Sequence, residues 1–538
     1  METLKIRKSD TGVNRQFLPL LFIFVYSTIL MLLVSKSSFI YYINDWVDIN
    51  SFYTMGKGWL HGKIPYRDLF DHKGPLLYFI YAIADLLSPR TYLGILLFEI
   101  MAIFTTLLLV YRIAASYMKE YAAVWATLLF SGLLVASPYF DAGAGVEELS
   151  YPFIMFTIYA IHRLNQNDFT LTFGESFLSG ICFGMIFWMK YTMLGGWLGF
   201  IVAYFVVSLI RKNAAAFFSF LGYFFLGFLA ISLPVIGYFF SVGALSDLYH
   251  IYFYVNLAVY PPNFHSKIGQ LGRGTYLFIT AFKQEVVLNA LMIFATIFVI
   301  NDKAIFRHIE TKMLYTASFL AMGMGTFFGG ISYRYYVLAL FPFGCIPVLC
   351  MCRHFFYQRK NDAYYNNIKT FLLACFTLIV ALNLNTNFFE SKFFAGNKTV
   401  SLRIPGEKTD HYKTAQYQFA KIINQEKKEK QTLLNYGFLD VGLYRAAAIV
   451  PDTKYFMKQN IAYDKYPVIM DTQNEIIDKK KVEFVVFRKR LRDDIVQAVP
   501  KNIRKNYMLI AKHSQFVTGE YTYLLYKVKP AEKERLSE

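Results

Sequence analysis

The strongest constraint on the fold is a series of long apolar runs that divides most of the chain. A helix needs about 20 apolar residues to cross the hydrocarbon core of a bilayer. Eleven segments qualify as candidates, and none lies beyond residue 387. The expected membrane-spanning helices are 17–35, 91–112, 121–137, 150–163, 173–189, 192–210, 215–240, 285–301, 312–330, 335–352 and 368–387.

The loops between these runs predict how the helices are oriented. With the basic N-terminus in the cytoplasm, every loop expected on that side carries lysine or arginine, as the positive-inside rule requires. This pattern requires that the apolar segment 76–87 does not cross the membrane. Pro75 and Pro89 bracket the segment, and a helix of that length covers only about 18 Å. We therefore predict an interfacial helix.

The composition excludes several other classes of protein. Hydrophobic residues make up 56% of the chain, more than in soluble domains. The cysteines lie within apolar runs without paired spacing, so neither a zinc site nor a disulfide framework is expected. Many of the lysines and arginines behind the net charge of +18 lie in short loops between apolar runs, where membrane topology explains them without nucleic acid. The first apolar run is too long for a signal-peptide core, so we expect an uncleaved span.

Residues 388–538 have a different character. Charges are spaced along this part, and short β-branched or alternating runs such as KKVEFVVFRK alternate with helical stretches such as TAQYQFAKIINQEKK. We predict two domains: a mainly α-helical transmembrane bundle over 1–387 and a soluble α/β domain over 388–538. An odd number of spans places the second domain outside the cytoplasm.

The loop after the first span carries an unusual number of ionisable residues. It runs from about residue 36 to residue 90, and loops this long are usually functional. Its acids include Asp45, Asp48 and Asp71, and its cations include Arg67 and Lys73.

Further charges are expected at the same membrane face. The second outer loop contributes Asp141, Glu147 and Glu148. Lys190 and Arg334 lie at the outer ends of apolar runs. Charges so close to a membrane are costly unless they are paired or used.

A carboxylate beside several cations suits group transfer from a phosphate-bearing lipid. The carboxylate accepts a proton from an acceptor hydroxyl, and the cations stabilise the departing phosphate. Nucleotide sugars are absent outside the cytoplasm, so we expect the activated sugar to be carried by a membrane lipid.

These motifs carry a resemblance to a known family. The first third of the chain resembles the polytopic GT-C glycosyltransferases that use polyprenyl-phosphate sugars, notably the bacterial lipid A aminoarabinose transferases and the protein O-mannosyltransferases. The resemblance rests on Asp48 followed by Tyr53, on the break GKIP at 62–65, and on Lys73 in FDHKGPLLYFIYAIADLL.

The resemblance implies roles for individual residues. Asp48 matches the aspartate that acts as base, and Lys73 matches the lysine that binds the lipid phosphate. An acid commonly follows the family aspartate, whereas Ile49 stands here, so Asp45 stays open as the counterpart. Adjacent Glu147 and Glu148 replace a spaced acidic pair. No metal or other cofactor is therefore expected, although a divalent metal stays open.

Each candidate also has a structural alternative. Asp48 is suited to capping a helix that begins near Asn50, and Lys73 to reaching lipid headgroups from an interfacial helix. Arg67 is placed to pair with its neighbour Asp68.

The remaining candidates have alternatives of the same kind. Acids at 147 and 148 suit the first turn of a helix. Asp71 orients Lys73 or binds substrate, and Lys190 and Arg334 bind phosphate or sugar or form structural pairs. Tyr335 and Tyr336 are expected in the interfacial aromatic belt rather than in a site.

We predict an inverting glycosyltransferase that moves a sugar from a polyprenyl-phosphate donor to a hydroxyl of a cell-envelope glycan or glycolipid. The expected location is the outer face of the cell membrane. Asp48 is the expected base; the expected substrate-binding residues are Arg67, Asp71, Lys73, Tyr53, Glu147, Glu148, Lys190 and Arg334. The alternative is a flippase for lipid-linked oligosaccharides or a polysaccharide exporter.

Overall fold

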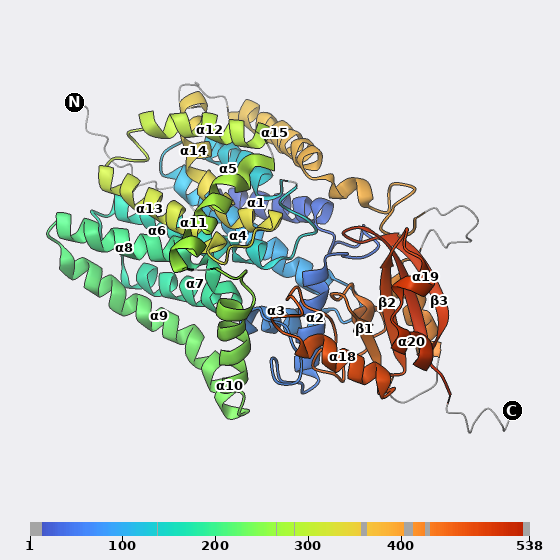
Figure 1. Ribbon diagram of the computed structural model, residues 1–538. Coiled ribbons are helices and arrows are strands. Elements are labelled where there is room, and N and C mark those ends of the chain that lie inside the picture. The colour runs from blue at the N-terminus through green and yellow to red at the C-terminus, as the bar shows by residue number, and fades with distance from the viewer. Residues whose placement is uncertain are drawn as a thin grey trace, which may run out of the picture.

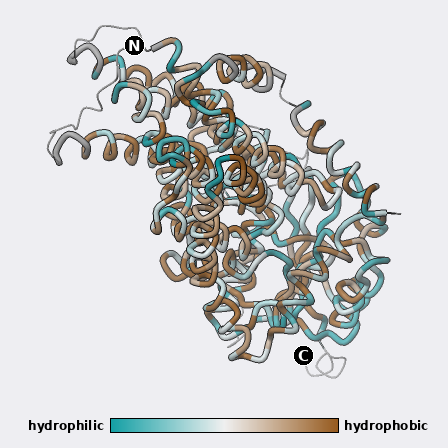
Figure 2. Tube along the Cα trace, turned by 90° about the vertical axis from the view of Figure 1, so that its left-hand side faces the viewer, coloured by the Kyte–Doolittle hydropathy of each residue, from teal (hydrophilic) through white to brown (hydrophobic). Residues whose placement is uncertain are grey.

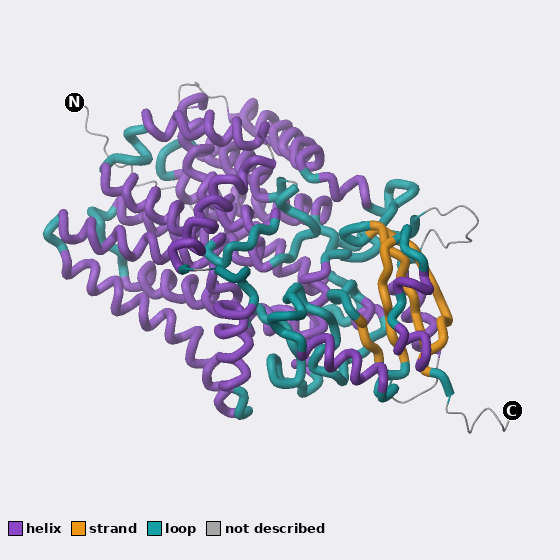
Figure 3. The backbone as a smooth tube through the Cα atoms, viewed as in Figure 1, coloured by secondary structure: helices purple, strands orange, loops and turns teal. Residues whose placement is uncertain are grey.

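The computed structural model describes residues 13–136, 138–264, 266–284, 286–356, 363–402, 413–425 and 431–530. A helical bundle is joined to a smaller domain that contains a sheet (Figure 1). Within the described residues, all named strands follow residue 432, and Figure 3 shows them gathered at one end of the molecule. The predicted class, a mainly helical polytopic bundle with a C-terminal α/β part, is confirmed.

The bundle contains helices over or close to all eleven predicted spans. Six helical segments of the described chain are long and apolar enough to cross a membrane, and Figure 2 shows how hydrophobic residues dominate this part. The helices are α1 (Val13–Val34), α4 (Leu93–Ala115), α5 (Glu120–Leu134), α6 (Val146–Gln166), α7 (Phe173–Lys190), α8 (Gly195–Ile210), α9 (Ala214–Ser241), α12 (Val286–Asn301), α13 (Ile309–Phe327), α14 (Cys345–Phe356) and α15 (Ala363–Leu384).

Local sequence explains several helix ends. Thr172 and Glu175 form a capping box at the start of α7, which satisfies two backbone N–H groups that a helix leaves free. The backbone at Lys190 is extended, with φ −162° and ψ 91°. This break ends α7 and separates it from η1 (Tyr191–Leu194) and α8.

Two regions depart from a simple series of α-helices. The predicted span 335–352 is divided into a 3-10 helix, η4 (Arg334–Gly344), and α14. Between α9 and α12, where no span was predicted, lie α10 (Leu245–Leu248), the π-helix η2 (Tyr249–Val259), α11 (Lys267–Thr280) and the 3-10 helix η3 (Ala281–Gln284).

The first outer loop contains two helices that lie between the bundle and the sheet domain (Figure 1). They are α2 (Val47–Leu60) and α3 (Pro75–Leu87). α3 begins with Pro75, whose fixed φ suits the first position of a helix. Its inner face buries Leu77, Tyr78 and Tyr81, while Phe79 and Leu86 are exposed. This division suits the interfacial helix that was predicted.

The C-terminal part follows the 3-10 helix η5 (Thr386–Glu390). Its sheet has the order β1-β2-β4-β3; β1 pairs parallel with β2, and the other pairs are antiparallel. The strands are β1 (Leu433–Tyr436), β2 (Phe484–Arg490), β3 (Tyr507–Phe516) and β4 (Glu520–Val528). The helices are α16 (Ala415–Gln425), α17 (Leu443–Ala446), α18 (Val468–Asp478), α19 (Ile495–Ala498) and α20 (Lys501–Asn506).

The segment between β1 and α18 packs against the first outer loop. Arg445 forms an ion pair with Asp85 of α3 at 2.9 Å, and both side chains are about 5% exposed. The Thr54 hydroxyl of α2 donates to Asp440 at 2.6 Å. The predicted division at residues 387 and 388 therefore separates two parts that share a polar interface, and its position stays a prediction.

Candidate functional site

Asp48 opens onto a cavity between the bundle and the sheet domain. The cavity has a volume of about 600 Å³. Asp48 lies in the first turn of α2, and Trp46 occupies the N-cap position without a side-chain cap bond. The alternative in which Asp48 caps the helix is therefore wrong. Its Oδ2 accepts a weak hydrogen bond from the Tyr335 hydroxyl at 3.4 Å.

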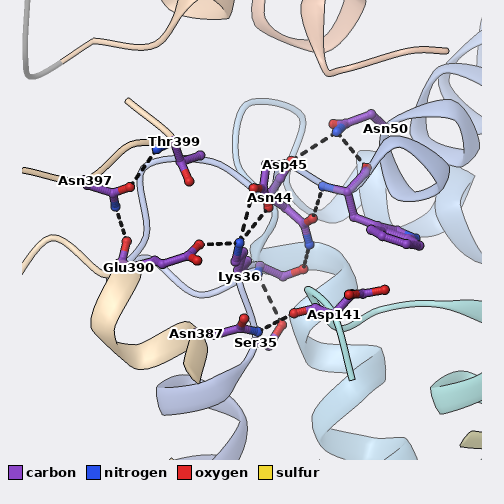
Figure 4. Close-up of polar contacts among 12 residues, drawn as sticks. Ser35, Lys36, Asn44, Asp45, Asn50, Asp141, Asn387, Glu390, Asn397 and Thr399 are labelled. Atoms are coloured by element: carbon purple, nitrogen blue, oxygen red, sulfur yellow. Dashed lines mark hydrogen bonds and ion pairs between the residues drawn. The ribbon is translucent and has the colours of Figure 1, made fainter. Parts of the chain in front are cut away.

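Asp45 is engaged in a different way. Its carboxylate accepts from Lys36 Nζ at 3.0 Å, and Lys36 also contacts Glu390 of η5 at 2.6 Å (Figure 4). Burial alone would lower the pKa of Lys36, but the two carboxylates outweigh it and raise the pKa. Asp45 thus belongs to a closed ion-pair cluster, whereas Asp48 forms no ion pair with the described residues.

Lys73 lies in a second, smaller pocket of about 70 Å³. The backbone around it is fixed, because its N–H donates to the Tyr78 hydroxyl at 2.9 Å and its carbonyl accepts from the Tyr66 hydroxyl at 2.6 Å. Burial acts to lower the pKa of Lys73, but nearby carboxylates, Asp48 and Asp71 foremost, raise it overall. Lys73 is therefore a charged ammonium at neutral pH.

His72 is held neutral beside Lys73. Burial, assisted by the Lys73 charge, lowers the pKa of His72 to about 3. Its Nδ1 lies 2.7 Å from Asn256 Oδ1, while the Asn256 amide donates to the His72 carbonyl at 2.6 Å. Because that amide oxygen can only accept, His72 carries its proton on Nδ1. Asn256 of η2 therefore orients the loop that presents Lys73.

Asp71 is oriented by the sheet domain. Its Oδ1 accepts from Gln459 Nε2 at 2.7 Å and from the His72 N–H at 2.8 Å. Burial raises the pKa of Asp71.

Lys190 and two tyrosines separate the cavity from the Lys73 pocket. Lys190 Nζ contacts Glu147 at 2.5 Å and lies 3.8 Å from the centre of the Tyr336 ring. Tyr335 lines the cavity, whereas Tyr336 lines the Lys73 pocket. The prediction of an interfacial belt is wrong for Tyr336, which is buried at 8% exposure.

The two glutamates begin α6, which confirms their expected place in a first helical turn. With Asp48 and Tyr335 they line a space of about 10 Å³ next to the larger cavity. No group of three His, Cys, Asp or Glu side chains suited to a metal ion occurs among the residues that the structure describes.

The remaining candidates lie apart from Asp48 and Lys73 or at the rim. Arg334 is exposed and lines the 600 Å³ cavity. Arg67 pairs with its neighbour Asp68 at 3.3 Å, as in the structural alternative, and donates to the Val242 carbonyl. Tyr53 is buried under the Arg445 guanidinium, whose Cζ lies 3.6 Å from its ring centre. Neither Arg67 nor Tyr53 lines these cavities, and their roles in binding stay predictions.

Several residues of the site were not predicted. Asn256 lies in η2 and Tyr260 directly follows it, in a region where the sequence offers only a tyrosine-rich apolar stretch. Gln459 and Arg488 come from the sheet domain and reach the site through the fold alone. Tyr335 and Tyr336 directly follow Arg334, a predicted site residue. Of the residues missed, these two could most easily have been predicted from the sequence.

The fold has counterparts among solved structures. ArnT from Cupriavidus metallidurans bound to undecaprenyl phosphate superposes with a TM-score of 0.54 at 9% identity, over 96% of this chain and 98% of that one. The chain has the ArnT fold. The apo state of the same protein gives a TM-score of 0.55 at 11% identity, over 96% and 99% of the two chains.

Sequence comparison adds a family match over part of the chain. Residues 72–260 match the family described as dolichyl-phosphate-mannose-protein mannosyltransferase. A search of curated protein sequences gives no match. The resemblance to the GT-C glycosyltransferases is confirmed, and the chain is a multi-pass membrane protein of that architecture.

Proposed function

We propose that the protein is an inverting glycosyltransferase that moves a sugar from a polyprenyl phosphate to a hydroxyl group at the outer face of the membrane. The proposal rests on two neighbouring cavities that present groups of opposite charge. One contains the carboxylate of Asp48, which forms no ion pair with the residues that the structure describes, and the other contains the ammonium group of Lys73. Tyr335 and Tyr336 lie between them.

The geometry supports binding of the donor and the acceptor in different cavities. The donor phosphate binds Lys73, and the acceptor enters the larger cavity. Asp48 accepts the proton of the acceptor hydroxyl, whose oxygen forms a bond to the anomeric carbon. The bond from that carbon to the phosphate oxygen breaks, and Lys73 stabilises the charge left on the phosphate. Attack from the side away from the phosphate inverts the anomeric centre.

The surroundings of Lys73 support a lipid-linked donor. The exposed apolar residues Phe79, Leu86 and Leu87 of α3 suit a helix that lies against lipid. The family matched over 72–260 is described by a lipid-linked sugar donor, and the ArnT structure holds undecaprenyl phosphate. A polyprenyl phosphate is therefore the proposed donor, with a cell-envelope glycan or glycolipid as acceptor.

The loop charges support an N-terminus in the cytoplasm and a sheet domain outside it. No step of the proposed reaction calls for a cofactor. Lys190 is neutralised by Glu147 at 2.5 Å, so we assign this pair to holding Tyr336 and the wall of the pocket rather than to binding phosphate.

The experiment is a transfer assay in lipid nanodiscs. Undecaprenyl-phosphate-linked glucose, galactose and mannose serve as donors, and release of undecaprenyl phosphate is the readout. Asp48→Asn and Lys73→Ala should each reduce turnover by about 10²–10⁴-fold. Lys73→Ala should also weaken binding of undecaprenyl phosphate itself, measured by native mass spectrometry.

Asp464→Asn is the matched control, because Asp464 is an exposed acid of the sheet domain. It should leave turnover unchanged. Wild-type turnover in Asp48→Asn would contradict the assignment of the base. Translocation of an intact lipid-linked sugar without release of undecaprenyl phosphate would instead favour a flippase.

A further inference from the structure

The sheet domain supplies one wall of the 600 Å³ cavity. Asn460 and Arg488 contribute polar groups, and Leu439, Phe516 and Thr518 complete that wall. The bundle and its outer loops supply the rest. A ligand in this cavity therefore contacts both domains, which gives the sheet domain a direct place at the site.

Arg488 is held in a defined orientation. It lies on β2, where pairing with Tyr523 of β4 fixes its backbone. Its guanidinium Cζ lies 4.2 Å from the centre of the Tyr521 ring and 5.0 Å from that of Phe438. Such stacking leaves the edges of the guanidinium free to donate hydrogen bonds. Its buried Nη1 lies beside the Tyr523 hydroxyl, and Arg488 lines the cavity.

The cations of the cavity differ in how far they are neutralised. Lys36 contacts two carboxylates, Asp45 and Glu390, at 3.0 and 2.6 Å. Arg334 lies at the exposed rim, where its charge acts on Asp141. Arg488 forms no ion pair with the described residues. The acids that line the cavity are Asp45, Asp48, Asp141 and Glu390, all outside the sheet, and Asp45 and Glu390 are paired with Lys36.

We propose that Arg488 binds an anionic group, a phosphate or a carboxylate, on the sugar acceptor. The acceptor site then spans both domains, with the reacting hydroxyl near Asp48 and the anionic group on the sheet domain. A guanidinium fork matches both kinds of anion through paired hydrogen bonds. This inference rests on the proposed function and specifies the acceptor of the same site.

The test uses the full-length protein in nanodiscs with glucose, glucose 6-phosphate and glucuronic acid as probes. Each probe is added to the assay of undecaprenyl phosphate release, and its direct binding is measured by calorimetry. Both anionic sugars should bind and affect turnover at lower concentrations than glucose, as acceptors or as inhibitors. Arg488→Gln should weaken their binding by about tenfold or more and leave glucose unaffected.

Arg490→Gln is the matched control, because Arg490 is an exposed arginine of the same strand and loses the same charge. It should bind the anionic sugars as the wild type does. Arg488→Lys keeps the positive charge but loses the paired N–H groups of the guanidinium. Its affinity for the anionic sugars should lie between those of the wild type and Arg488→Gln. Preference for only one of the two anionic sugars would identify the group as phosphate or carboxylate.

Three outcomes would overturn the inference. Equal binding of glucose and both anionic sugars by the wild type is one. Unchanged anion binding in Arg488→Gln is another. Loss of anion binding in Lys73→Ala but not in Arg488→Gln is the third, because the anion would then occupy the donor pocket. Calorimetry needs no turnover, so failure of the transferase proposal stays distinguishable from failure of this one.

Discussion

Asp141 occupies a site where burial and charge oppose each other. It lies in the loop between α5 and α6 and lines the cavity with Asp48. Burial raises the pKa of its carboxyl group to about 6, although the positive charges of Arg334 and Lys36 act to lower it. The carboxyl group is therefore more easily protonated in the folded state than in the unfolded chain.

This shift predicts a pH-dependent effect of Asp141→Asn on stability. Because the folded pKa is raised, the favourable contribution of Asp141 is fully present below pH 4 and lost as pH rises through 6. The variant cannot ionise, so at pH 7 it should be about 2–3 kcal/mol more stable than the wild type. The two proteins should converge near pH 4. Thermal unfolding in detergent from pH 4 to 8 measures the difference.

Arg334→Gln provides the second arm of this experiment. Removing the cation should raise the pKa of Asp141 further and move the stability transition to higher pH. A difference between wild type and Asp141→Asn that stays constant over the whole range would contradict the assignment.

At the scale of elements, Gly74 explains how the Lys73 loop docks onto α7. Its N–H donates to the Met189 carbonyl at 3.0 Å. A Cβ at this position would lie 2.0 Å from the Trp188 carbonyl oxygen, closer than real contacts allow. Gly74 separates Lys73 from Pro75, and the close approach of the two backbones requires a residue without a Cβ at this position.

Gly74→Ala should therefore displace the start of α3 and the lysine before it. We expect a loss of about 1–3 kcal/mol in stability and reduced release of undecaprenyl phosphate. Gly174→Ala is the control, since nothing lies within 4 Å of a Cβ there, and helix propensity favours alanine. Thermal unfolding and the nanodisc assay are measured on both variants. Equal stability of Gly74→Ala and wild type would show that the loop can move without cost.

The same elements show what the sequence could predict. Apolar runs and bracketing prolines predicted the helices, including α3, because both signals are local. The hydrophobic periodicity of the sequence does not predict the π-helix η2. This helix places Asn256 against His72, a residue 184 positions earlier in the sequence. The contact of Gln459 with Asp71 joins residues 388 positions apart. Such contacts depend on tertiary packing, so local patterns predicted the candidate acids and bases but not the groups that orient them.

At the scale of the whole molecule, a buried ion pair connects the two domains. Arg445 of α17 pairs with Asp85 of α3 and stacks on Tyr53. Its guanidinium also donates to the Ser88 and Thr91 carbonyls. The same interface contains the hydrogen bond from Gln459 to Asp71. Separation of the domains would therefore release the loop that carries Lys73.

Arg445→Met should loosen this interface. It leaves the Asp85 carboxylate buried without its cation, and breaking a buried pair in this way costs about 3–5 kcal/mol. Hydrogen–deuterium exchange should increase in α3 and in residues 443–466, and undecaprenyl phosphate release should fall. Arg492→Met, a change of an exposed arginine in the same domain, should alter neither measurement.

A second variant separates the effect of charge from that of packing. Asp85→Leu combined with Arg445→Met removes both charges, so the burial penalty disappears. Protection of α3 should recover in part, while the carbonyls of Ser88 and Thr91 still lack their donor. If turnover recovers together with protection, the sheet domain acts on Lys73 by holding the first outer loop in place. Full protection in Arg445→Met alone would mean that apolar contacts suffice to dock the domain.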